Sequence, residues 1–66
     1  MFAEILKELR ISNGLKQQDL AAKLLVNQSN ISDWERGISR PEYEHLIILA
    51  DIFDVSLDEL LGRKPI

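Results

Sequence analysis

The chain has 66 residues, no cysteine and a formal net charge of −3. This length allows one domain, near the lower size limit for a core that folds without disulfides or metals. No apolar run approaches the ~20 residues of a membrane span, and the N-terminus lacks a basic segment followed by an apolar one. We therefore expect one cytoplasmic domain over residues 1–66, with no membrane partner and a frayed tail at residues 62–66.

Charge is distributed unevenly along the chain. Residues 1–40 carry six basic and five acidic side chains, whereas residues 41–66 carry two basic and six acidic. Because salt screens charges beyond a Debye length of ~8 Å, a charged partner responds mainly to the face that it meets. The acidic balance weakens a nucleic-acid interpretation without excluding it.

Apolar residues recur at helical spacing along the first half of the chain, and no segment alternates as a strand would. The first helix is expected to run from Phe2 to about residue 12, where Asn13-Gly14 stops it. The second should run from Gln17 to Leu25. The third should follow Asn27 as its N-cap and end at Gly37.

Two further helices are expected in the second half. Pro41 is well placed at the start of the fourth, which should end at Asp54 or Val55. Ser56 and Glu59 have the spacing of a capping box, which opens a fifth helix. The sequence thus predicts an all-α, compact five-helix domain.

Few residues could support catalysis. An active site needs a nucleophile, an acid–base pair or a metal cluster, and the single histidine, His45, is expected in solvent or at the rim of the core. The chain has no glycine-rich phosphate loop, no metal-ligand set and no helix with a cationic face for a membrane. We predict no enzyme, no cofactor, no metal and no small-molecule substrate.

The stretch Gln17–Arg36 reads as two short amphipathic helices joined by a tight turn. Short polar side chains face outward on the second of them, as a helix in the major groove requires. Gln28 can pair with the edge of adenine, and Asp33 can accept from cytosine N4. A solvated helix face would look the same, so polarity alone leaves both interpretations open.

Several motifs occur in order along the chain: LKELR at 6–10, GL at 14–15, QQDLAAKL at 17–24, V-x-x-S-x-I-S-x-WERG at 26–37 and VSLDELL at 55–61. In this set the chain resembles the Cro/repressor (XRE-type, lambda-repressor-like) helix-turn-helix family, from about Leu6 to Leu61. The resemblance implies a helix-turn-helix formed by the second and third helices. It also implies double-stranded DNA as the partner.

The resemblance implies roles for single residues. Positions that contact bases in the family are occupied by Gln28, Ser29, Ser32 and Asp33. Positions that meet or approach the DNA backbone are occupied by Gln17, Asn30, Arg36 and Arg40. Positions of a partly buried ion pair between the first and third helices are occupied by Arg10 and Glu35.

Some positions depart from the family pattern. Leu25 stands where the turn usually has glycine, and a left-handed non-glycine residue costs ~1–2 kcal/mol. Lys16 and Glu42 replace the usual Ser or Thr caps, and Asp54 replaces a usual glycine. The base-reading face carries the acidic Asp33 and no basic residue, which puts affinity in question more than fold.

Surplus apolar residues suggest self-association. Ile48 stands where the family usually has a polar residue, and with Ile52 it extends the apolar surface beyond the core stripe. These residues are either extra core or a dimer contact that also involves the last helix and Ile66. The family resemblance implies a transcriptional repressor that binds a palindromic operator as a homodimer. A protein-interaction module, and an antitoxin or controller protein of the same fold, are the alternatives.

Overall fold

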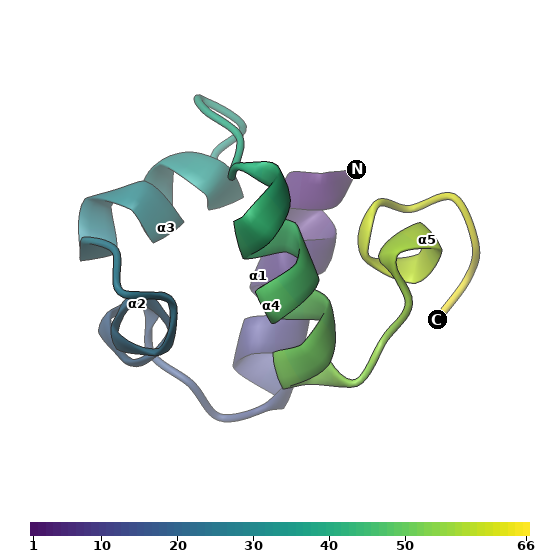
Figure 1. Cartoon of the computed structure of the whole chain (residues 1–66), viewed down its shortest axis with the longest axis horizontal. Coiled ribbons are helices and arrows are strands. Elements are labelled where there is room, and N and C mark those ends of the chain that lie inside the picture. Colours follow the sequence, from purple (N-terminus) through teal and green to yellow (C-terminus); the bar gives the residue numbers. More distant parts are fainter.

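Five α-helices and no strand make up the computed structural model, which describes all 66 residues. The predicted all-α, five-helix fold is therefore confirmed. None of the helices is long and apolar enough to cross a membrane. In Figure 1, α4 crosses the front of the molecule, with α2 and α3 on one side of it and α5 on the other. The helices are α1 (Phe2–Ser12), α2 (Gln17–Leu24), α3 (Gln28–Glu35), α4 (Tyr43–Phe53) and α5 (Leu57–Leu60).

All five helices contribute to one hydrophobic core. Helices of 4 to 11 residues are marginal alone, so burial of their apolar stripes against one another stabilises them. The helix pairs in contact include α2 with α3, α1 with α3, and α4 with α5. The ten buried residues are Leu6, Leu20, Ala21, Leu24, Ile31, Trp34, Leu49, Ala50, Phe53 and Leu60.

The turn between α2 and α3 passes through Leu25, which adopts the left-handed conformation with φ 58° and ψ 41°. The Val26 N–H donates to the Ala21 carbonyl at 3.0 Å, which closes the end of α2. The side chain of Leu25 is 92% exposed, so it gains almost no burial in return for its backbone strain. The tight turn is therefore made at a residue that is poorly suited to it.

Side chains cap the helices that follow tight turns. Asn27 is the N-cap of α3, as predicted, but the side-chain bond comes from Asn30, whose Oδ1 accepts from the Asn27 N–H at 3.0 Å. The predicted capping box of α5 is confirmed: the Ser56 N–H donates to Glu59 Oε1 at 2.7 Å, and the Glu59 N–H donates to Ser56 Oγ at 3.0 Å. These bonds satisfy amides that the first turn of a helix leaves free.

At the start of α4, the cap position expected for Glu42 is confirmed, whereas Pro41 lies just before the helix. Glu42, not Pro41, is adjacent to the first helical residue, and its extended backbone (φ −72°, ψ 165°) makes it the N-cap. The first helical bond runs from the Leu46 N–H to the Glu42 carbonyl at 3.1 Å. Pro41 is instead half-buried in the preceding loop, where it lines a groove with Trp34 and Leu46.

We predict that Leu25→Gly will stabilise the domain. Glycine adopts positive φ without the penalty of a β-carbon, and the lost side chain is solvent-exposed. The gain should be about 1 kcal/mol, reduced by the greater freedom of glycine in the unfolded chain. Urea unfolding would measure it. Leu25→Ala, which keeps the β-carbon, is the matched control and should show no comparable gain.

Candidate functional site

A largely buried ion pair joins α1 to α3. Arg10 Nε donates to Glu35 Oε2 at 2.6 Å, and Arg10 Nη2 donates to Glu35 Oε1 at 3.0 Å. The two side chains are 12% and 3% exposed. Arg10 Nη1 also donates to the Leu15 carbonyl at 2.9 Å, and the hydrogen bonds to Glu35 raise the pKa of Arg10 above its usual value. Arg10 is thus committed to Glu35 and is unavailable to a ligand.

Gln17 connects this ion pair to the exposed face of α3. Its Nε2 donates to Glu35 Oε1 at 3.1 Å, and its Oε1 accepts from Gln28 Nε2 at 3.4 Å. Gln17 is the first residue of α2, and Gln28 is the first residue of α3. The beginnings of the two helices are therefore tied together through one side-chain amide, and one amide N–H of Gln17 is still free to donate.

The four residues predicted to read bases lie on one face of α3, because positions i, i+1, i+4 and i+5 of a helix share a side. Gln28 and Ser29 are exposed, while Ser32 and Asp33 are half-buried. Asn30, predicted to meet the DNA backbone, uses its Oδ1 for the cap of α3, and its amide N–H groups make no hydrogen bond within the chain. The face consists of short donors and acceptors.

Two arginines follow this face. Arg36, the residue after α3, places Nη2 3.3 Å from Asp33 Oδ1, and the two side chains are 63% and 37% exposed. Arg40 lies exposed in the loop before α4 and forms no ion pair. The sequence predicted both arginines near a DNA backbone, but it did not indicate that Arg36 would contact Asp33.

His45 lies half-buried at the edge of the core. Its ring centroid is 5.5 Å from that of Trp34, and its Nδ1 is buried without a hydrogen-bond partner. This location agrees with the predicted rim of the core rather than with solvent.

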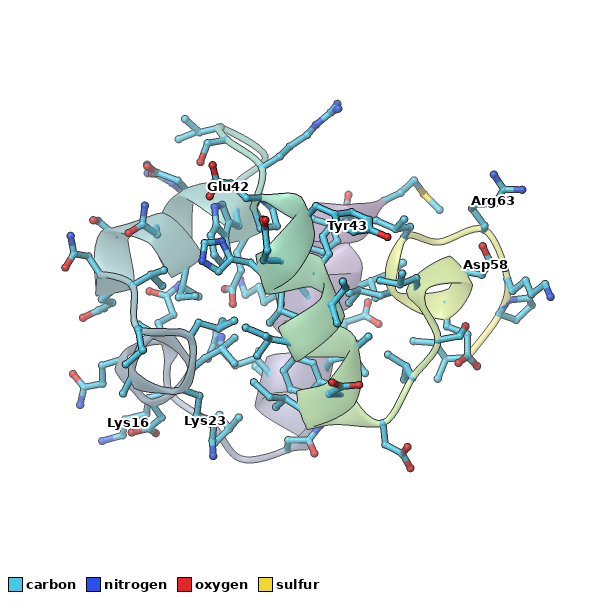
Figure 2. The ribbon with its side chains drawn as sticks, in the orientation of Figure 1. Lys16, Lys23, Glu42, Tyr43, Asp58 and Arg63 are labelled. Carbon is cyan, nitrogen blue, oxygen red and sulfur yellow. The ribbon has the colours of Figure 1, made fainter.

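The outer side of α4 carries exposed apolar residues together with the exposed acidic residues Glu44 and Asp51. Ile48 is 38% exposed and Ile66 is 68% exposed, whereas Ile52 is half-buried against the core. Two residues were missed: Tyr43 is 68% exposed, and Ile47 is 40% exposed. Their i,i+4 spacing is the signal that could have identified them. In Figure 2, Tyr43 extends from the first turn of α4 toward the side of α5.

Known proteins are similar to this chain in sequence and in fold. The family model described as "Helix-turn-helix" matches residues 6–60. The HTH-type transcriptional activator BcrR of Enterococcus faecalis is 42% identical over 65 residues, which are 98% of this chain and 32% of BcrR.

Two crystal structures show the same likeness. A transcriptional regulator from Listeria innocua has a TM-score of 0.91 and 39% identity, over 94% of this chain and 58% of that one. The P22 c2 repressor in complex with a synthetic operator has a TM-score of 0.85 and 28% identity, over 91% of both chains. The chain spans between 32% and 55% of the length of the curated relatives most similar to it.

We predict that Glu35→Ala will destabilise the domain by about 3 kcal/mol, because it leaves the Arg10 charge largely buried without its partner. Urea unfolding monitored by circular dichroism would measure the loss. The double variant Arg10→Met, Glu35→Leu is the control and should recover most of the stability, since it removes both charges. A single variant as stable as the original chain would contradict a structural role for the pair.

Proposed function

Since this chain belongs to the XRE-type helix-turn-helix family of transcriptional regulators, we propose that it binds a palindromic operator in double-stranded DNA as a homodimer. We propose further that it represses transcription by occupying a promoter. The observation that carries the proposal is the polar face of α3, which the bonds through Gln17 and Glu35 hold in one orientation. The likeness to the P22 repressor bound to its operator supports it.

In this proposal α3 enters the major groove. Gln28, Ser29, Ser32 and Asp33 face the base edges, and Gln28 pairs with an adenine through its amide. Gln17 uses its free amide N–H, together with the first amides of α2, to hold a phosphate. The remaining contacts to the DNA backbone come from Asn30 and Arg40.

Dimerisation is part of the proposal because the DNA-contacting surface of a single domain is small. One small domain contacts too few base pairs for tight specificity, whereas two recognition helices ~34 Å apart read both halves of a palindrome. We propose the outer face of α4 as the dimer contact, with Ile48 at its centre. Tyr43, Ile47 and the half-buried Ile52 lie on the same helix. Ile66, proposed as a further part of the contact, lies instead in a groove that Met1 and Ile5 also line. The direction of regulation is proposed as repression because the P22 protein is a repressor, although BcrR is an activator.

Selection of bound sequences from a random duplex library tests this function. We expect a palindrome with half-sites about one helical turn apart, and binding that weakens steeply as salt rises. No enrichment at low salt would overturn the proposal, and a protein partner would then be the next target of study.

On the selected duplex, Gln28→Ala should weaken binding by about 1–3 kcal/mol, because a bidentate contact to adenine is lost. Binding to random DNA should change little. Fluorescence anisotropy titrations on both duplexes measure the difference. An equal loss on the two would make Gln28 a contact to the backbone.

Ile48→Asp should weaken self-association by at least about tenfold, because it places a charge in an apolar interface. The domain should stay folded, since Ile48 is 38% exposed. Sedimentation equilibrium gives the dimer constant. Ile11→Asp is the matched control on α1, where Ile11 is 58% exposed, and it should leave the dimer intact. Equal effects of the two substitutions would exclude α4 as the contact.

A further inference from the structure

We propose that Asp33 and Arg36 form one unit that reads a cytosine in each half-site, with Asp33 as the base-contacting residue and Arg36 as its positioning residue. The inference rests on the proposed binding of double-stranded DNA. Arg36 Nη2 and Asp33 Oδ1 lie 3.3 Å apart.

The backbone holds the two residues in register at the end of α3. The Ile38 N–H donates to the Asp33 carbonyl at 2.9 Å, and the Arg36 N–H donates to the Ser32 carbonyl at 3.0 Å. These bonds close the last turn of the helix around Arg36. The backbone of Arg36 is therefore held next to the turn that carries Asp33. The Arg36 guanidinium contacts only one of the two carboxylate oxygens of Asp33.

The second oxygen of Asp33 is the reading atom. Oδ2 makes no hydrogen bond within the chain, and the side chain is 37% exposed on the same face as Gln28 and Ser29. A bare carboxylate in the major groove would be repelled by the phosphates on either side. The Arg36 charge offsets that repulsion, so Asp33 can approach a base edge as part of a neutral pair.

The chemistry of a carboxylate selects the base. An ionised carboxylate only accepts hydrogen bonds. In the major groove, guanine presents two acceptors, thymine presents an acceptor and a methyl group, and adenine presents a donor beside the acceptor N7. Cytosine presents its N4 donor without an adjacent acceptor on the same base. Cytosine is therefore the base that Asp33 fits.

The role of Arg36 as a positioning residue differs measurably from a contact between Arg36 and a phosphate. A phosphate contact would act on every sequence alike, and its removal would lower the salt slope by about one. A positioning residue acts through Asp33, so its removal changes the preference for one base. The two roles therefore differ in base preference, which a loss of folding alone would not alter selectively.

The experiment repeats the library selection with the original chain and with Asp33→Asn, Arg36→Ala and Arg63→Ala. Titrations then follow on the selected duplex and on duplexes with the cytosine replaced. Arg63→Ala is the matched control: Arg63 Nε lies 3.4 Å from Asp58 Oδ1 in a similarly exposed pair at α5, away from α3 (Figure 2). Circular dichroism melts verify that each variant is folded.

We expect the original chain to select cytosine at one position of each half-site. Asp33→Asn should move that preference toward adenine, which an amide pairs with. Arg36→Ala should reduce the preference for cytosine about tenfold and leave the other positions unchanged. The control variant should keep the full profile.

Two results would overturn the inference while the proposed function stands. The first is an Arg36→Ala variant that binds all duplexes more weakly, with a lower salt slope and an unchanged cytosine preference. The second is an Asp33→Asn variant with the original base profile. Failure of the original chain to enrich any sequence would instead overturn both the proposed function and this inference.

Discussion

The ion pair between Arg10 and Glu35 joins α1 to α3 inside the domain. Removing both charges from water is costly, and a buried pair is favourable only when its geometry is good and its remaining donors and acceptors are satisfied. Here the geometry is bidentate, and further hydrogen bonds surround the pair. Glu35 accepts two bonds from Arg10 and one from Gln17, and Arg10 gives a further bond to the Leu15 carbonyl. The pair therefore connects α1, the following loop, α2 and α3.

This connection matters because the hydrophobic core alone is not directional. Burial of apolar side chains such as Leu20 and Ile31 is favourable in any direction of approach, whereas charged hydrogen bonds are short and have strict geometry. The core holds α2 and α3 together, and the bonds to Glu35 orient α3. Gln17, which is bound to Glu35, also accepts a hydrogen bond from Gln28 on the surface. The orientation of the exposed face is thus fixed from inside the domain.

The sequence predicted what depends on neighbouring residues. The five helices and the capping box at Ser56 follow from local spacing and backbone preference, and the structure contains them. The left-handed conformation of Leu25 goes against the backbone preference of leucine, and only the family pattern, with its usual glycine, indicated it. Pro41 was expected at the start of α4 and lies instead just before Glu42, which is the N-cap at the position that the family pattern indicated. The fold was thus predictable nearly in full.

The candidate site was predictable only in part. The residue types on the face of α3 and the pairing of Arg10 with Glu35 were indicated by pattern and by family resemblance. The connection through Gln17 was not, since it requires the relative placement of three helices. The contact between Arg36 and Asp33 has a local i,i+3 spacing, but each residue also has solvent as an alternative partner. Spacing therefore allows the pair without requiring it.

Ion pairs and hydrogen bonds of the carboxylates in α2 and α3 explain how an acidic chain can present a surface suited to DNA. The helices α2 and α3 contain three acidic side chains. Asp19 accepts from the Lys16 N–H at 2.9 Å, Glu35 is bound to Arg10, and Asp33 contacts Arg36. Two of the three carboxylates are therefore paired with arginines, and the third, Asp19, accepts a backbone hydrogen bond. Because screening confines electrostatics to ~8 Å, this local balance outweighs the formal net charge of −3 at the interface we propose.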